Sequence, residues 1–262
     1  MCSQIMASLH DIEQRHDVTV LFACESGSRG WGFASPDSDY DVRFVYVNRL
    51  PWYLTVAPQR DVIELPISGD LDVNGWDLRK ALDLMRESNP TLLEWLRSPI
   101  VYREEADTMP RFRALSQALF SNVRAWNHYS SMAKKNFREH LQAEKVRYKK
   151  YLYVLRPLLA ARWIRTQPGV PPMRFAELAQ RTLDVTHDAA LIAEIDALLE
   201  VKMRAGEAAT SPRWRGIHAF IESELAANAA DPVQALPSAD ASALDSFLLE
   251  TVLRFDKEGA RT

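Results

Sequence analysis

The stretch from residue 18 to residue 47 constrains the fold more than any other part of this 262-residue chain. It begins with the apolar run VTVLFAC (18–24) and ends with DYDVRFVYV (39–47), which is rich in β-branched and aromatic residues. Such runs are typical of buried strands. The segment between them, ESGSRGWGFASPDS, is rich in Gly, Ser and Pro and predicts a loop or a short helical turn. We therefore expect two strands joined by a polar loop.

The rest of the chain changes character at about residue 108. Before it, short strands are predicted at 52–56, 61–67 and 70–75. Asp77 is expected to cap a helix through Glu87, and Asn89-Pro90 to begin another through Leu96. The predicted helices cover residues 4–16, 108–164, 174–182, 187–205, 212–228 and 241–256. This layout predicts an α+β fold, with a small mixed sheet in residues 1–107 and an all-helical region in residues 108–262.

The composition is that of a globular protein that buries a core, with 47% hydrophobic and 26% charged residues. Two distant cysteines, Cys2 and Cys24, form neither a disulfide framework nor a zinc site, so a reducing, cytoplasmic setting is expected. The N-terminus lacks the basic start and apolar run of a signal peptide. No apolar stretch approaches the roughly 18–20 residues that span a bilayer, so we expect no membrane partner.

Charge is distributed unevenly along the chain. Residues 111–165 contain 13 Lys and Arg against 2 Asp and Glu, a net charge of +11, whereas the segments on both sides are acidic. A basic block between acidic ends indicates a surface that faces a polyanion. The same pattern also fits the solvated faces of helices, and composition alone does not separate the two interpretations.

Chemistry is indicated by the order of Gly27-Ser28, a spacer, and Asp39-Tyr40-Asp41. Gly27 lets the backbone approach a ligand closely, and Ser28 with its neighbouring N–H groups can hold a phosphate. Asp39 and Asp41 are two residues apart on a predicted strand, so their carboxylates point to the same side. Hard carboxylate oxygens suit Mg²⁺. The alternative is a turn with solvated carboxylates, since SPDSD has strong turn composition.

A third carboxylate is expected on the later segment GDLDVNGWD. Asp70 and Asp72 would face the same side of a strand. We favour Asp72 because it lies further inside the apolar pattern, and Asp70 fits a turn with Gly69. Glu64 is a weaker third option.

At these residues the sequence resembles the DNA polymerase β-like nucleotidyltransferase superfamily, which pairs a Gly-Ser motif with Asp-x-Asp and a third acid. It is more closely similar to the RNA repair pathway DNA polymerase beta family (RlaP), whose members are predicted nucleotidyltransferases. The similarity covers residues from about 18 to 165, and a further short match lies at 171–178. It is carried by GSRGWGFASPDSDYDVRFVYV, LDVNGWDLRKAL, SNPTLLEWLRSPIVY, KKYLYVLRPLLAARWI and PPMRFAEL.

The resemblance implies a polymerase β-like sheet that carries the acids, followed by helices that help to hold a nucleotide. Gly27 and Ser28 match the phosphate-binding motif, Asp39 and Asp41 the metal-binding pair, and Asp72 the third acid. A nucleoside triphosphate and Mg²⁺ or Mn²⁺, as two ions, are the implied ligands. The family name implies RNA as a further partner.

Several basic residues are candidates for contacts with phosphates. Lys150 and Arg156 are the leading candidates for the triphosphate; Arg29 either holds a phosphate or pairs with Asp37 or Glu25. For Arg43, contact with substrate and contact with the acids are equally favoured. Nearby tyrosines offer stacking faces for bases, but most fit a core stripe better. The residues proposed to face RNA are Lys134, Lys135, Arg138, Lys145, Arg147 and Lys149.

Two functional hypotheses follow. The favoured one is a nucleotidyltransferase that moves a nucleoside monophosphate from a triphosphate to an acceptor hydroxyl, with an RNA 3′ end as the favoured acceptor and a protein or small molecule as alternatives. The other is a non-catalytic nucleotide- or RNA-binding module, such as a sensor or an antitoxin-like partner. The presence of Asp39, Asp41 and Asp72 together favours the enzyme. The nucleotide and the oligomeric state stay open.

Overall fold

A computed structural model of the chain describes residues 1–204, 210–230, 233–235 and 240–259. The chain divides into two compact units. Unit 1 consists of Met1–Gly27, Asp39–Phe120 and Ser238–Thr262, and unit 2 consists of Ser28–Ser38 and Ser121–Pro237. The loop that follows Gly27 thus belongs to a different unit from the strands on either side of it.

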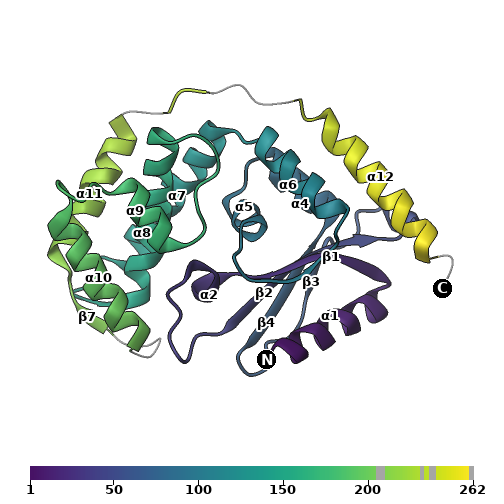
Figure 1. Cartoon of the computed structure of the whole chain (residues 1–262), viewed down its shortest axis with the longest axis horizontal. Helices are drawn as coiled ribbons and strands as arrows, with labels where there is room; N and C mark the ends of the chain where they lie inside the picture. Colours follow the sequence, from purple (N-terminus) through teal and green to yellow (C-terminus); the bar gives the residue numbers. More distant parts are fainter. Residues whose placement is uncertain (205–209, 231–232, 236–239, 260–262) are drawn as a thin grey trace. The chain divides into compact units, whose positions relative to one another are not determined.

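Unit 1 is built on a five-stranded mixed sheet (Figure 1). Its strands lie in the order β3-β4-β2-β1-β5. The pair β2 and β4 is parallel, and the other neighbours are antiparallel. The bounds are β1 Val18–Glu25, β2 Tyr40–Asn48, β3 Val62–Glu64, β4 Leu71–Asp77 and β5 Val101–Glu104. The mixed sheet and the helices that follow it confirm the predicted α+β class.

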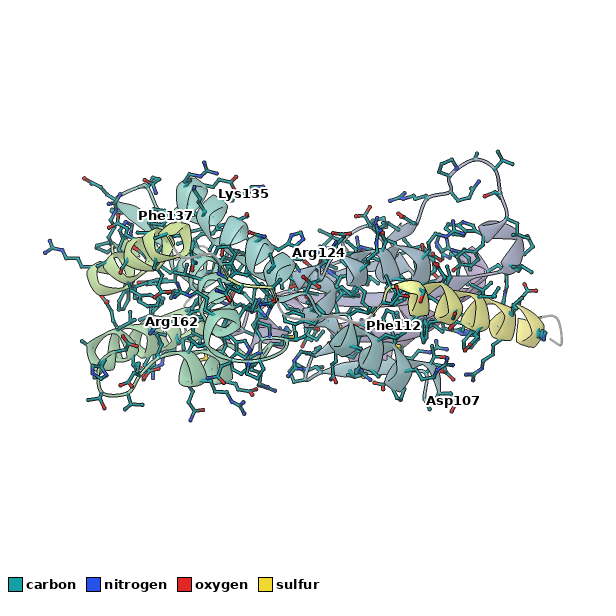
Figure 2. The ribbon with its side chains drawn as sticks, turned by 90° about the horizontal axis from the view of Figure 1, so that it is seen from above. Asp107, Phe112, Arg124, Lys135, Phe137 and Arg162 are labelled. Atoms are coloured by element: carbon teal, nitrogen blue, oxygen red, sulfur yellow. The ribbon has the colours of Figure 1, made fainter. Side chains whose placement is uncertain are left out.

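Helices cover both faces of this sheet (Figure 1). Helix α1 (Cys2–His16) buries Ile5, Leu9 and Ile12 against one face, as their spacing predicted. The other face packs against four helices, two of which lie directly after β4 in the chain. Phe112, labelled in Figure 2, stacks on Phe247 at a centroid distance of 5.5 Å. These four helices are α4 (Leu78–Arg86), α5 (Pro90–Leu96), α6 (Thr108–Ala118) and α12 (Ser242–Gly259).

The predicted helix starts after β4 are confirmed. The Asp77 carboxylate accepts a hydrogen bond of 2.8 Å from the backbone N–H of Arg79 at the start of α4. The Asn89 side chain accepts from the N–H groups of Thr91 and Leu92 at the start of α5, with Pro90 as the first helical residue. These caps fix where α4 and α5 begin, because they satisfy N–H groups that a helix leaves without partners.

One local prediction in unit 1 is wrong, and one strand was missed. Residues 52–56 were expected to form a strand, but Leu50–Tyr53 form a helical turn, α3, with Pro51 in its first turn. Proline is preorganised for that position, and this outweighs the strand preference of the aromatic residues beside it. Strand β5 was not predicted, because its four residues are exposed or half-buried and show no apolar pattern.

The described residues of unit 2 form helices, the loops between them and one short two-stranded ladder. Helix α8 is buried along most of its length and contacts α7, α9, α10 and α11, among which it lies in Figure 1. Strand β6 interrupts the predicted helical stretch 108–164 and pairs with β7. The bounds are α7 Asn122–His140, β6 Lys145–Arg147, α8 Tyr148–Thr166, α9 Phe175–Thr182, α10 Ala189–Arg204, β7 Thr210–Pro212 and α11 Arg215–Ala230. The short helix α2 (Gly27–Trp31) begins at the last residue of unit 1.

Among the described residues, no helix has both the length and the hydropathy that crossing a bilayer requires.

Candidate active site

Two acidic side chains meet on unit 1 because β2 and β4 are parallel and in register. Asp41 of β2 lies directly opposite Asp72 of β4. Their neighbours Val42 and Val73 point into the core under α1, so the two carboxylates point to the opposite face of the sheet. The Asp41 and Asp72 side chains are 28% and 33% exposed. The arrangement places two ionisable oxygens side by side on a surface that a ligand can reach.

Arg43 connects these two carboxylates. Its Nη2 donates to Oδ1 of Asp41 at 3.0 Å and to Oδ2 of Asp72 at 2.7 Å, and its Nη1 donates to the Asp72 carbonyl at 3.1 Å. The side chain is 18% exposed. Of the two roles predicted for Arg43, the structure therefore shows contact with the acids. The guanidinium offsets the repulsion between two neighbouring anions, which is the charge balance that a bound cation would also supply.

The other acids considered from the sequence lie around this pair. Asp39 is exposed and directly precedes β2. Asp70 is exposed and precedes β4, and its carbonyl accepts the Tyr40 N–H at 2.7 Å. Glu64 lies on β3, where it pairs with Arg60 at 2.8 Å and accepts from Asn74 at 2.9 Å. Of the three alternatives for the third acid, Asp72 is the one in register with Asp41.

Gly27 is required by the position of Asp41. It has a φ of 56°, in the left-handed region. A Cβ atom built on Gly27 would lie 1.9 Å from Oδ2 of Asp41 and 2.8 Å from its Cγ. The backbone is tied to the same residue, because the Ser26 N–H donates to the Asp41 carbonyl at 2.8 Å. The Gly-Ser motif and the Asp-x-Asp motif thus meet at Gly27, which has no side chain to displace the carboxylate.

Glu25 is a residue of this site that sequence reasoning missed. It is fully buried at the end of β1, and its Oε1 accepts the Asp41 N–H at 2.8 Å. Its Oε2 accepts a short hydrogen bond from the Tyr102 hydroxyl. Burial, together with this bond to Glu25, raises the pKa of Tyr102 well above its usual value. A charged residue closing the apolar run VTVLFAC was the available signal.

The residues predicted to bind phosphate, apart from Gly27, lie in unit 2. The Ser28 carbonyl accepts the N–H groups of Gly32 and Phe33 at 3.1 and 3.0 Å, which closes the turn after α2. Arg29 donates from Nη2 to the Ser38 carbonyl at 2.7 Å. The side chain of Arg29 therefore contacts the backbone at the end of its own loop.

Helix α8 packs a set of rings and cations beside α2. Arg156 is only 3% exposed, with its guanidinium 4.8 Å from the Trp31 ring and Nη2 3.4 Å from the Met173 carbonyl. Trp31 meets Tyr153 edge to face at 5.7 Å. Lys150 lies 5.3 Å from the Tyr153 ring. Two of the predicted phosphate ligands thus come from the same helix and lie close to the segment that carries Ser28.

The two cations differ in how they could meet a ligand. Lys150 is half-buried, and its Nζ lies 3.2 Å from Nε2 of His140. Burial lowers the pKa of Lys150, and the positive charges of Lys149 and Arg147 lower it further. Arg156 is buried against Trp31, a position suited to supporting the loop.

The predicted RNA-facing residues lie along α7, β6 and the start of α8. Lys134, Lys135 and Arg138 are exposed on α7; the Lys135 side chain, labelled in Figure 2, is 67% exposed. Lys145 and Arg147 are exposed on β6, and Lys149 is half-buried. Among the tyrosines, Tyr129 and Tyr151 are buried, as a core stripe predicts.

The donor set of unit 1 fits a hard divalent cation that is also bound by substrate. Within the part of the chain that the structure describes, no three His, Cys, Asp or Glu side chains are close enough to hold a metal ion by themselves. Asp41 and Asp72 supply two carboxylates, and Mg²⁺ commonly binds through one or two carboxylates together with substrate phosphates. A metal ion bound by Asp41 and Asp72 would therefore also need the phosphates of a nucleotide as ligands.

Comparison with a family model agrees with the resemblance inferred from the motifs. A model of the RNA repair pathway DNA polymerase beta family (RlaP) matches residues 1–250. The Bacillus subtilis (strain 168) protein named "Uncharacterized protein YcgL" is 44% identical over 261 residues, which are 99% of each chain. A crystal structure of a nucleotidyltransferase-like protein from Exiguobacterium sibiricum 255-15 is 12% identical, with a TM-score of 0.34, over 86% of this chain and 75% of that chain.

The family model covers almost the whole chain and includes the acids, the Gly-Ser motif and the helices α7 and α8. The resemblance seen from about residue 18 to residue 165 is therefore confirmed and extends to residue 250. The chain belongs to the RNA repair pathway DNA polymerase beta family (RlaP).

Proposed function

We propose that this chain is a metal-dependent nucleotidyltransferase that transfers a nucleoside monophosphate from a nucleoside triphosphate to an acceptor hydroxyl. Family membership supports transferase chemistry in general. The observation that carries the proposal is the register of Asp41 and Asp72, which places two carboxylates on one face of the sheet beside Gly27. Asp39, two residues before Asp41, is the other acid of the Asp-x-Asp motif.

In this proposal the acceptor oxygen attacks the α-phosphorus, and the bond to the bridging oxygen of pyrophosphate breaks. Bound Mg²⁺ or Mn²⁺, as two ions, would supply charge stabilisation to the attacking and leaving oxygens. Asp39 and Asp41 would hold both ions, and Asp72 would hold the ion nearer the acceptor and take up its proton. Catalysis by these residues is mostly positioning and electrostatic stabilisation.

The remaining residues would hold the substrates. Gly27 and Ser28, with Arg29 and Lys150, would bind the β- and γ-phosphates through backbone N–H groups, a hydroxyl and cations. Arg156 would support this group through Trp31, which its guanidinium covers. The favoured acceptor is the 3′ end of an RNA whose phosphates lie along the basic residues of α7 and β6.

The test is transfer of label from each α-³²P ribonucleoside triphosphate to total cellular RNA, with Mg²⁺ or Mn²⁺. Asp41→Asn is expected to abolish labelling while the protein stays folded, because the amide removes a charged ligand and keeps the volume. Asp83→Asn, a change of an exposed acid on α4, is the matched control and should label as the wild type does. Retained labelling in Asp41→Asn would refute the assignment.

Two further variants identify the third acid. Asp72→Asn should lose labelling, and Asp70→Asn should keep it. The opposite result would make Asp70 the third ligand.

One observation favours a second candidate, a nucleotide- or RNA-binding module without turnover. Arg43 already balances the charges of Asp41 and Asp72. In such a module this ion pair would be permanent. Nucleotide binding that is unchanged by EDTA, with no label transferred to RNA, protein or small molecules, would favour this candidate over the enzyme.

A further inference from the structure

Lys202 of α10 is a buried lysine whose ammonium group contacts the loop between α2 and β2. It is 3% exposed, and its Nζ lies 3.1 Å from Oγ of Ser35 and 3.3 Å from Oγ of Ser38. Lysine is almost never buried unless its charge is paired or hydrogen-bonded, because desolvating an ammonium costs several kcal/mol. A methionine would fill the same space without that cost. The hydrogen bonds of Lys202, rather than its volume, therefore explain the residue.

The two serines form a closed turn. The Ser35 N–H donates to Oγ of Ser38 at 3.0 Å, and the Ser38 N–H donates to the Ser35 carbonyl at 3.0 Å. Both side chains are 3% exposed. Arg29 donates to the Ser38 carbonyl at 2.7 Å. Ser38 is therefore held through its hydroxyl by Lys202 and through its carbonyl by Arg29.

The position of Ser38 bears directly on the acids, because the next residue in the chain is Asp39. Asp41 lies within the β2–β4 ladder, and its backbone N–H is held by Glu25. Asp39 precedes β2, so its backbone follows the last residue of the loop. A shift of Ser38 would move Asp39 more than it would move Asp41.

We propose that Lys202 is a positioning residue for the metal site, acting through Ser38 on Asp39. The role rests on the proposed function and adds to it a residue far away in sequence from the acidic motif. Lys202 touches no substrate in this role; it fixes the loop end from which Asp39 projects.

The test measures binding of Mn²⁺ alone to the full chain, by the loss of the free Mn²⁺ signal in electron paramagnetic resonance. Lys202→Met is expected to raise the Kd by about 10- to 100-fold, the usual effect of removing a partner that orients a metal ligand. Lys257→Met changes an exposed lysine of α12 and should leave the Kd unchanged. An unchanged Kd in folded Lys202→Met would overturn the inference.

A double-mutant cycle separates positioning from a general loss of stability. In an Asp39→Asn background, Lys202→Met should change the Kd by less than twofold, because the ligand that it positions is already lost. An equal fold-change in both backgrounds would overturn the inference.

Ser38→Ala removes the same contact from the other side, and it serves where Lys202→Met does not fold. It should weaken Mn²⁺ binding in the same direction, and an unchanged Kd would count against the role. A wild-type chain that binds Mn²⁺ neither alone nor together with a non-hydrolysable nucleoside triphosphate would contradict the proposed function itself, and the positioning role with it.

Discussion

At the scale of single residues, Gly27 has two reasons to be glycine, and the sequence motif indicated only one of them. The sequence suggested that a phosphate needs close approach to the backbone at Gly27. The structure adds that the space beside it is taken by Asp41, whose Oδ2 would lie 1.9 Å from a Cβ at this position. Glycine is thus required both by a φ of 56° and by a carboxylate of the proposed metal site.

Gly27→Ala is expected to lower transfer activity by about 100-fold, because the new methyl group forces the Asp41 carboxylate out of place. Gly69→Ala is the matched control: Gly69 has a φ of 59°, and nothing lies within 4 Å of its Cβ position. Both variants should lose about 1–2 kcal/mol of unfolding free energy from left-handed backbone strain. Urea unfolding and the labelling assay measure the two effects, and equal activity in the two variants would contradict this account.

The contacts of Glu25 and Lys202 could not be predicted from the sequence. Asp39 and Asp41 are separated by one residue in the sequence, so their spacing alone predicts a shared side. Glu25 acts through a hydrogen bond between two strands, and Lys202 reaches a serine 164 residues earlier in the chain. Neither contact has a local pattern, because each depends on how separate elements pack.

At the scale of elements, segments with a strong apolar period were predictable, whereas α3 and β5 were not. Helix α1 and strands β1 and β2 have strong apolar patterns that the sheet and its core preserve. Strand β5 has four residues and no buried side chain, and it forms because β1 offers an open edge. Its place is secured by side chains: Arg113 of α6 holds Glu104 at the end of β5.

The pair of Glu104 and Arg113 predicts a pH dependence of stability. Hydrogen bonds from Arg113 lower the pKa of Glu104 below its usual value, against a smaller opposing effect of burial. A carboxyl whose pKa is lower in the folded state stabilises the fold fully above the unfolded pKa. That contribution is lost as pH falls through the folded pKa.

Glu104→Gln should therefore lower the free energy of unfolding by about 1 kcal/mol at pH 7 and by much less at pH 3.5. The value at pH 7 is kept small because both side chains are about 30% exposed and solvent screens the ion pair. Urea unfolding at the two pH values measures the difference. Asp83→Asn, which changes an exposed acid on α4, should show no such pH dependence. A cost for Glu104→Gln that is equal at both pH values would contradict the role of the ion pair.

At the scale of the whole molecule, the chain order does not match the compact units. Helix α12 belongs to unit 1 although it follows all the helices of unit 2. Its Phe247, Val252 and Phe255 are buried in the core that covers the sheet. The sequence predicted a final helix at 241–256 but not where it packs, because an apolar helix face must be buried and its sequence does not identify the surface that covers it.

The uneven charge is the whole-molecule feature that bears on RNA. The acids lie on unit 1, and most of the basic segment 111–165 lies on unit 2, with Lys134, Lys135 and Arg138 exposed on α7. Each phosphate contact releases counterions when RNA binds. The logarithm of the affinity for single-stranded RNA therefore falls linearly with the logarithm of the salt concentration, with a slope proportional to the number of contacts. Counting contacts by their salt dependence therefore tests whether this block is an RNA surface or a solvated helix face.

Replacing Lys134, Lys135 and Arg138 together with alanine should reduce the slope of log affinity against log salt by about 2, from roughly 0.7 for each contact. The control replaces Arg15, Arg60 and Arg86, three exposed arginines of unit 1, and changes the net charge by the same amount. Fluorescence anisotropy of a labelled single-stranded RNA at several salt concentrations gives both slopes. If the α7 cations contact RNA, only their variant loses slope, since net charge alone would lower both equally. Equal slopes in the two variants would assign these cations to a solvated face.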